Sequence, residues 1–121
     1  MQKEVTPNMN KEETQMMAFQ LIGFAGDAFS HFFQAIDAAK KADYEEAERL
    51  IQEGKKSMKE AHDAQTDLVS AEADGKDLAY SILMVHAQDH LTMALMYERL
   101  ASEFISVYKE MNELKGKLIN E

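Results

Sequence analysis

The sequence predicts an all-α domain, folded as an up-down-up bundle of three helices. Its 121 residues are enough for one domain and too few for two separate cores. One proline and five glycines, among many residues that lose little rotamer freedom in helices, favour helix nearly throughout. Apolar residues recur at helical steps, and the expected connections are short, so neighbouring helices should run antiparallel.

The first helix is expected at residues 11–41. Asn10 and Glu13 have the spacing of a capping box, which satisfies free backbone N–H groups at a helix start. Residues 1–9 are polar and lack an apolar period, so they are predicted to form a flexible extension to a single domain over 10–121. The apolar face of this helix is expected to contain Ala18, Ile22, Ala25, Phe29, Phe32, Ile36 and Ala39.

The second helix is expected at residues 44–73. Asp43 and Glu46 repeat the capping pattern, and Gly75 can take the left-handed conformation that ends a helix. Gln65 interrupts an otherwise apolar or small stripe, which consists of Ala47, Ile51, Gly54, Met58, Ala61, Gln65 and Leu68.

The third helix is the longest, with Asp77 as its expected cap and residues 77–118 as its expected range. A helix of that length spans roughly 60 Å, and two partner helices cannot bury it well. Its near-heptad stripe should therefore also meet copies of itself, which predicts a homo-oligomer. The stripe, with Asp89 in its middle, is Leu78, Ile82, Val85, Asp89, Met93, Met96, Leu100, Phe104, Val107, Met111, Leu114 and Leu118.

Polar residues concentrate at one height of the predicted bundle. The antiparallel turn places Gln65 level with His86, and His86 and His90 are i,i+4 neighbours on one helix face. Gly23 and Gly26 should fall near this layer and leave room beside it. The layer comprises His62, Gln65, His86, Gln88, Asp89 and His90.

Asp89 needs a partner, because an isolated carboxylate on a buried apolar seam is costly. One interpretation is a buried hydrogen bond that fixes helix register. The other uses symmetry: if copies of this helix surround one axis, their carboxylates converge on it and would suit a hard cation such as Mg²⁺.

His86 and His90 allow several interpretations. They could be a satisfied structural pair, or they could bind a hydrolytic metal with Asp89, although Asp89 points about 100° away from His90. The spacing HAQDH is similar to the zinc motif HExxH, but Ala87 replaces the general-base Glu, which argues against a peptidase.

An imidazole nucleophile is the remaining possibility. A neutral histidine ring accepts a phosphoryl group on its free nitrogen, and the protein mainly has to position the ring and stabilise the phosphoryl oxygens. Donors for that supporting role are available on Gln65, Gln88 and His90.

The amino-acid composition argues against several other classes of protein function. A formal net charge of −9 argues against binding nucleic acid or anionic lipid, and zero cysteines exclude thiolate catalysis. No stretch approaches the roughly 20 apolar residues of a membrane span, so a cytoplasmic protein without direct membrane insertion is expected.

Three segments resemble one family: GFAGDAFS in the first helix, EAHDAQTDL in the second and, above all, YSILMVHAQDHLTMALM in the third. Over residues 12–112 the chain is similar to enzyme IIA of the lactose/cellobiose class, which includes diacetylchitobiose, of the bacterial phosphoenolpyruvate-dependent sugar phosphotransferase system. The resemblance implies a homotrimer with nine helices.

The same resemblance implies a phosphoryl carrier with a phosphohistidine intermediate. His86, the first histidine of the HxQDH motif, would be phosphorylated by the phosphocarrier HPr and would pass the group to a cysteine of the cognate enzyme IIB, during uptake of a lactose/cellobiose-type disaccharide. Asp89 would bind one magnesium ion per trimer on the symmetry axis. Phe29 departs from the family pattern, where a basic residue is common, and this affects the expected docking surface.

An alternative from another class remains: a helical oligomeric adaptor in which the polar layer is only structural.

Overall fold

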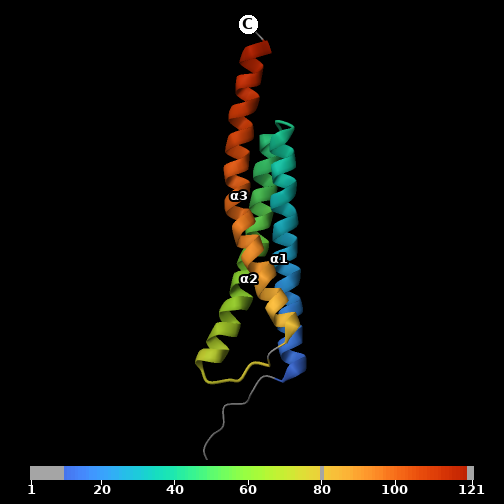
Figure 1. Ribbon diagram of the computed structural model, residues 1–121, viewed down its shortest axis with the longest axis vertical. Helices are drawn as coiled ribbons and strands as arrows, with labels where there is room; N and C mark the ends of the chain where they lie inside the picture. Colours follow the sequence, from blue (N-terminus) through green and yellow to red (C-terminus); the bar gives the residue numbers. More distant parts are fainter. Residues whose placement is uncertain (1–9, 80, 120–121) are drawn as a thin grey trace, which may run out of the picture.

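The computed structural model describes residues 10–79 and 81–119, and these ranges contain three helices and no strand. Helix α1 spans Lys11–Lys40, α2 spans Tyr44–Ala73 and α3 spans Ile82–Ile119. They run up, down and up (Figure 1), which confirms the predicted fold class. The expected extension at residues 1–9 lies outside the described residues.

Both predicted capping residues are found at the starts of α1 and α2. The Asn10 side chain accepts from the Glu13 backbone N–H at 2.8 Å, and the Glu13 carboxylate accepts from the Asn10 amide at 3.1 Å. The Asp43 side chain likewise accepts from the Glu46 N–H at 3.2 Å. These contacts satisfy N–H groups that have no partner within their own helix, so they fix where the two helices begin.

The connection between α1 and α2 is a tight turn around Ala42. This residue has φ 63°, in the left-handed region that L-amino acids with a side chain disfavour. The backbone N–H of Asp43 donates to the Ala38 carbonyl at 2.9 Å, which ties the turn back to the last turn of α1. The two helices therefore leave the turn side by side.

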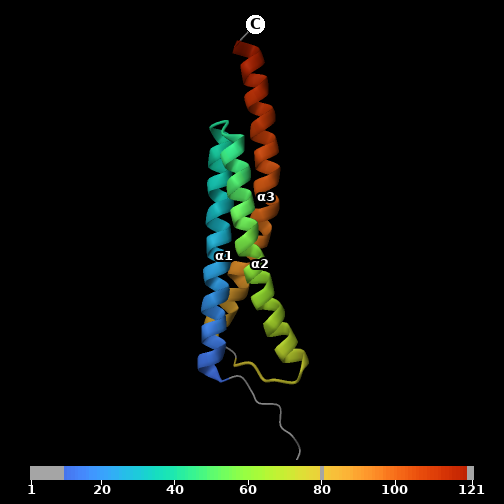
Figure 2. The same cartoon turned by 180° about the vertical axis from the view of Figure 1, so that it is seen from behind.

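The predicted start of the third helix is wrong by five residues. Helix α3 begins at Ile82, and Ser81 is its capping residue: its hydroxyl accepts from the Met84 N–H at 3.1 Å and its carbonyl from the Val85 N–H at 3.2 Å. The end of α2 diverges from the other helices in Figures 1 and 2, and non-helical chain is needed to return from it to α3. Asp77 lies in that connection.

Helix α1 is the centre of the domain. It packs along both α2 and α3, whereas α2 and α3 meet each other much less. Small side chains dominate these contacts and allow close approach of the backbones, with Phe32 and Leu21 as the large, fully buried exceptions. The expected members Ile22, Phe29 and Ile36 are only half-buried. The buried face of α1 is Thr14, Ala18, Leu21, Ala25, Ala28, Phe32, Ala35, Ala38 and Ala39.

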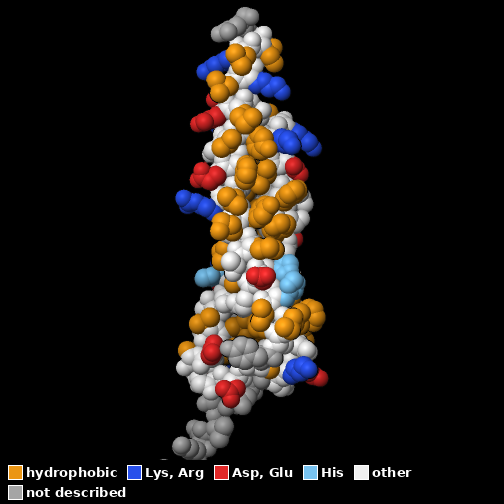
Figure 3. All heavy atoms as spheres, in the orientation of Figure 1, with side chains coloured by type: hydrophobic (Ala, Val, Ile, Leu, Met, Phe, Trp, Pro, Cys, Tyr) orange, Lys and Arg blue, Asp and Glu red, His pale blue; other side chains and the backbone are white. Residues whose placement is uncertain are grey.

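The apolar stripe of α3 faces away from α1 and α2. Helix α3 buries mainly small residues, Ala87, Ala94 and Ala101, together with Leu91. Its larger apolar side chains form a long exposed band along this face of the molecule (Figure 3). The band, called the α3 stripe below, comprises Ile82, Val85, Met93, Met96, Leu100, Phe104, Val107, Met111, Leu114 and Leu118. None of the helices described has the length and apolar character to cross a membrane.

Candidate functional site

His86 and His90 form a direct ring-to-ring contact one turn apart on α3. Their Nε2 atoms are 3.0 Å apart, and the rings meet edge to face with centroids 4.4 Å apart. His86 is exposed and His90 is half-buried. Because only one proton can lie between the two nitrogens, one ring donates and the other accepts, and the contact fixes the orientation of the exposed ring.

An aromatic contact between α1 and α3 supports this side of the site. The rings of Phe29 and Tyr97 have centroids 4.4 Å apart. Since α1 and α3 run parallel (Figure 1), helix geometry puts the residues two turns before this contact, Ile22 and His90, at similar heights. Gly23 and Gly26 have nothing within 4 Å of where a Cβ would lie, and Gly23 lines a hollow with Lys56 and Ser57 of α2. The expected room beside the histidines stays a prediction.

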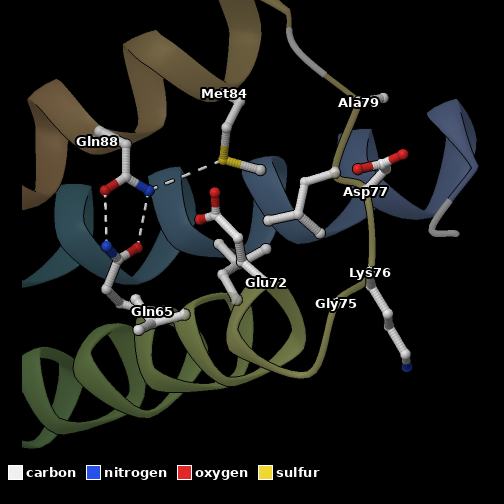
Figure 4. A pocket seen from close by; sticks show the side chains of 11 residues that line it. Gln65, Glu72, Gly75, Lys76, Asp77, Ala79, Met84 and Gln88 are labelled. Atoms are coloured by element: carbon white, nitrogen blue, oxygen red, sulfur yellow. Dashed lines mark hydrogen bonds between the residues drawn. The ribbon is translucent and has the colours of Figure 1, made fainter. Parts of the chain in front are cut away.

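Gln65 on α2 and Gln88 on α3 form a reciprocal amide pair (Figure 4). The Gln65 amide donates to Gln88 Oε1 at 2.8 Å, and the Gln88 amide donates to Gln65 Oε1 at 2.7 Å. Gln88 also approaches the sulfur of Met84 at 3.8 Å. The two half-buried amides thereby satisfy each other and join α2 to α3, the two helices that have the fewest contacts with each other.

The two pairs lie on different sides of α3. Gln88 follows His86 by two residues, so the two side chains project about 200° apart around the helix. Within one chain the glutamine amides therefore point toward α2 while the histidines lie on the side of α1. The predicted supporting role of Gln65 and Gln88 at His86 stays a prediction, whereas His90 is in direct contact.

A cavity of about 370 Å³ opens beyond the glutamine pair. It lies between the last turns of α2, the connection after it and the first turn of α3, and Figure 4 shows Met84 and Glu72 projecting into this region. The divergence of α2 from the bundle creates this space.

Asp89 interrupts the apolar α3 stripe and lies in sequence between Gln88 and His90. Its side chain is exposed, and nearby members of the stripe are exposed as well: Val85 is 58% and Met96 is 58% exposed. In the described part of the chain Asp89 has no hydrogen bond or ion pair. A carboxylate in the middle of an exposed apolar band is suited to contacts that one chain does not supply.

The other histidines do not join this site. His62 is exposed on α2, and His31 contacts the Asp27 carbonyl at 2.8 Å on α1. Among the residues that the structure describes, no group of three or more His, Asp or Glu side chains could hold a metal ion within one chain. The hydrolytic site with His86, His90 and Asp89 on one ion is therefore not formed.

The sequence did not indicate the aromatic contact or the thioether contact. Phe29 was expected on the apolar face of the first helix and as a departure from the family pattern, and the structure shows that it packs against Tyr97. The available signal was the spacing of Tyr97, two turns after His90 and thus on the same side of α3.

Comparisons with known proteins agree on one family. The family model described as the lactose/cellobiose-specific IIA subunit of the phosphotransferase system matches residues 16–109. The lactose-specific EIIA component of Staphylococcus aureus is 45% identical over 101 residues, covering 84% of this chain and 98% of that protein. The Staphylococcus epidermidis counterpart is 42% identical over 102 residues, with coverages of 84% and 98%.

Solved structures extend the likeness to the fold. The crystal structure of a cellobiose-specific enzyme IIA from Bacillus anthracis matches with a TM-score of 0.81 and 38% identity, covering 87% of this chain and 94% of that one. The IIA component in the solution structures of a IIA(chitobiose)–HPr complex of the N,N′-diacetylchitobiose system matches with a TM-score of 0.72 and 27% identity, covering 83% and 97%.

Proposed function

Because this chain belongs to the lactose/cellobiose-specific IIA family of the sugar phosphotransferase system, we propose that His86 is the residue on which it carries the phosphoryl group. The observation that carries this proposal is an exposed imidazole whose orientation is fixed by a neighbouring ring at 3.0 Å. The donor is the phosphocarrier HPr, and the acceptor is a cysteine of the cognate IIB component, in the cytoplasm.

The transfer consists of two displacements at phosphorus. In the first, the lone pair of His86 Nε2 forms a bond to phosphorus as the bond from phosphorus to the histidine of HPr breaks. In the second, a IIB thiolate forms a bond to phosphorus and the bond to His86 breaks. Neither step creates or consumes a co-substrate, so positioning and charge stabilisation are the main requirements.

His90 positions the nucleophile. When the His90 Nε2–H donates to His86 Nε2, the proton of the neutral His86 ring lies on Nδ1 and the Nε2 lone pair accepts the hydrogen bond, so this hydrogen bond must break as the lone pair attacks phosphorus. Once Nε2 bonds to phosphorus, the same N–H is placed to donate to a phosphoryl oxygen. His90 thus orients the ring before transfer and stabilises charge after it.

The glutamine pair, unlike His90, lies on a different side of α3 from His86. Gln65 and Gln88 hold each other at 2.7 and 2.8 Å and join α2 to α3. We assign them first to holding the helix that carries His86, and a direct contact with the phosphoryl oxygens would require the pair to open.

The exposed α3 stripe supports a homotrimer with nine helices. The stripe runs along α3 opposite the face that packs on α1, so three copies can bury it against one another about a common axis. An apolar band of this length is the usual mark of a protein interface.

Asp89 fits a metal ion only in such an assembly. One chain has no metal-binding cluster in its described residues, but three Asp89 carboxylates brought together by the stripe would supply the oxygen ligands that a hard cation such as Mg²⁺ prefers. The ion would neutralise converging charges at the seam. It has no part in the transfer steps, which His86 and His90 carry out.

The nature of the partners follows from the family and from one relative. The IIA relative solved in complex with HPr supports HPr as the donor for this chain. The relatives are lactose- and cellobiose-specific, which supports a disaccharide of that type as the transported sugar.

Phosphoryl transfer from purified phospho-HPr to ¹⁵N-labelled protein tests the assignment. The wild-type chain should take up one phosphate on His86 Nε2, seen by ³¹P and ¹⁵N NMR, and His86→Ala should take up none while remaining folded. His90→Gln should slow the transfer by about 10- to 100-fold, the usual scale for one positioned donor.

Matched controls are available because two other histidines lie outside the site. His31→Ala and His62→Ala should be phosphorylated at the wild-type rate. Phosphate uptake by the His86→Ala variant would refute the assignment. Unchanged sugar phosphorylation with that variant would instead favour the oligomeric adaptor.

A further inference from the structure

The cavity beyond the glutamine pair has no part in the proposed transfer. Its volume of about 370 Å³ lies at the lower end of the range for small-molecule sites. The last turns of α2 bound it on one side, the first turn of α3 bounds it on the other, and the connection between them closes its end. A small ligand in this space would contact three segments of one chain.

Aliphatic side chains form the walls of the cavity. They include Leu68, which is buried, and Leu78 and Met84, which are half-buried. No aromatic ring is among the lining residues that the structure describes. Such walls suit a narrow hydrocarbon stem, because burial of CH₂ groups and dispersion are the interactions that they offer.

Glu72 places a carboxylate beside these walls. Figure 4 shows it turned toward Met84 and the glutamine pair, whereas the side chain of Lys76, which also lines the cavity, extends away from it. The Glu72 carboxylate has no hydrogen bond or ion pair with any described residue. A carboxylate next to apolar walls is stabilised by an opposite charge, and an incoming ligand can supply one.

The end of α2 adds to the negative potential at this place. The C-terminal end of a helix carries a partial negative charge, which favours a cationic side chain in the last turn. The last turn of α2 contains no basic residue. The Oε1 atoms of Gln65 and Gln88 each accept one hydrogen bond within their pair and keep a second lone pair for a further N–H donor.

We propose that this cavity binds a small organic cation, a guanidinium or ammonium group carried on an aliphatic stem. The cation pairs with the Glu72 carboxylate beside the end of α2, and the stem packs against Leu68, Leu78 and Met84. The formal net charge of −9 favours the approach of a cation and opposes that of an anion. A neutral ligand would leave the carboxylate without an opposite charge.

This site lies on another side of α3 from His86. Gln88, which lines the cavity, projects about 200° away from His86 around the helix. A bound cation therefore contacts the glutamine pair without covering the histidines. The cation site is separate from the phosphoryl site and does not depend on the proposed function.

Titration of the full-length protein with n-butylguanidinium tests the site. Binding should shift the ¹³C-methyl NMR signal of Met84 and the side-chain amide signals of Gln65 and Gln88, which line the cavity. The methyl signal of Met111, near the other end of α3, should stay unchanged. The absence of a saturable shift at Met84 would overturn the proposal.

Two related ligands separate the contribution of the charge from that of the stem. Methylguanidinium keeps the cation without the long stem and should bind at least about fivefold more weakly, because fewer CH₂ groups are buried. Pentanoate has a similar stem with a carboxylate and should not bind, since Glu72 repels it. Equal affinities of the two guanidinium ligands would show that the apolar walls are not used, and binding of pentanoate would show that the site does not select cations. Either result would overturn the proposal.

Glu72→Gln removes the charge and nearly keeps the size of the side chain. It should raise the dissociation constant of n-butylguanidinium at least about fivefold, because a charge-assisted hydrogen bond becomes a neutral one. The matched control is Glu45→Gln, which removes the same charge from the exposed first turn of α2. The control should leave the dissociation constant within about twofold at physiological salt, because distant surface charges are screened. Equal weakening by the two variants would mean that net charge alone attracts the ligand, and the proposed site would be wrong.

Phosphate uptake separates the cation site from the proposed function. With n-butylguanidinium at saturation, the wild-type chain should accept phosphate from phospho-HPr at the rate of the ligand-free protein. If n-butylguanidinium binds but phosphate uptake fails even without it, the proposed function is wrong and the cation site stands. If uptake succeeds and n-butylguanidinium does not bind, the cation site is wrong and the carrier stands.

Discussion

His86 and His90 show how much of the site depends on two residues one turn apart. Their rings share one proton across 3.0 Å, so protonation of both rings would place two N–H groups face to face and break the contact. The pair could be predicted from the i,i+4 spacing alone, because helix geometry brings such side chains together regardless of the rest of the fold.

The pairing of Gln65 with Gln88 was predictable only in part. The heights of the two residues follow from an antiparallel hairpin, and the structure brings them into contact as those heights suggest. Their separation from His86 could not be predicted in the same way, since it depends on where α1 and α2 lie around α3. That arrangement is set by packing of the whole bundle.

Replacing either glutamine should destabilise the protein through the partner left behind. Gln65→Leu and Gln88→Leu should each cost about 1–2 kcal/mol of unfolding free energy, because the remaining half-buried amide loses its partner. The double variant should cost less than the sum, with a coupling of about 1 kcal/mol. Urea unfolding at one fixed protein concentration measures all four proteins.

Gln52→Leu is the control for this cycle. Gln52 is an exposed residue of α2 that donates to Glu48 on the surface, and its loss should change the unfolding free energy by less than about 0.5 kcal/mol. Strictly additive effects of the two glutamine changes would show that the amide pair contributes nothing.

At the scale of elements, Gly54 marks the closest approach of α1 and α2. A Cβ added there would lie 2.5 Å from Cε1 of Phe32, whose side chain is fully buried. Helix propensity favours alanine by about 1 kcal/mol, but a rigid ring cannot move aside in a close-packed interface. The steric cost should therefore exceed the gain in propensity.

Gly54→Ala should lower the unfolding free energy by about 1–3 kcal/mol, the usual cost of overpacking. The matched control is Gly116→Ala in α3, where an added Cβ meets nothing within 4 Å and the same change should stabilise by up to about 1 kcal/mol. Thermal unfolding of both variants compares them. A Gly54→Ala variant as stable as wild type would show that the interface can relax.

Helix starts were predicted well where local chemistry alone decides them. Asn10 and Asp43 cap α1 and α2 as their sequences indicate. Asp77 and Ser81 are both suitable caps for α3, and the choice depends on how far the end of α2 diverges from the bundle. The divergence of α2 from the bundle cannot be predicted from a single sequence.

The faces of α3 illustrate a second limit. Its large apolar residues form a regular stripe, yet the face that packs on α1 consists of Ala87, Leu91, Ala94 and Ala101. Alanine is common in any helix, so an alanine face gives little contrast in a hydrophobic pattern. The prediction that the stripe meets copies of the chain stays a prediction, and its exposure in one chain is what such contacts require.

At the scale of the whole molecule, a variant at Asp89 distinguishes two hypotheses for this residue: a metal-binding carboxylate on a symmetry axis, or a structural polar residue that fixes helix register. If the α3 stripes meet on an axis, Asp89→Leu should keep the oligomer and raise its stability by about 1–4 kcal/mol without metal, because a packed side chain replaces converging charges. Sedimentation and thermal unfolding in the presence of a chelator measure both effects.

Metal binding supplies the control for the Asp89 variant. Mg²⁺ titration by calorimetry should show one ion per trimer in the wild-type chain, no binding in Asp89→Leu and retained binding in His90→Ala. Dissociation of Asp89→Leu into monomers would contradict the axial position of this residue.

The length of α3 has a practical consequence for anyone who attaches a label or a surface linker. His86 lies near the beginning of this helix, and Ile119 lies about 50 Å further along it at 1.5 Å per residue. The start of α1 lies at the histidine end (Figure 1). A fluorophore attached at the end of α3 would therefore leave the histidines open to partner proteins, whereas one attached at the start of α1 would lie at their end of the molecule.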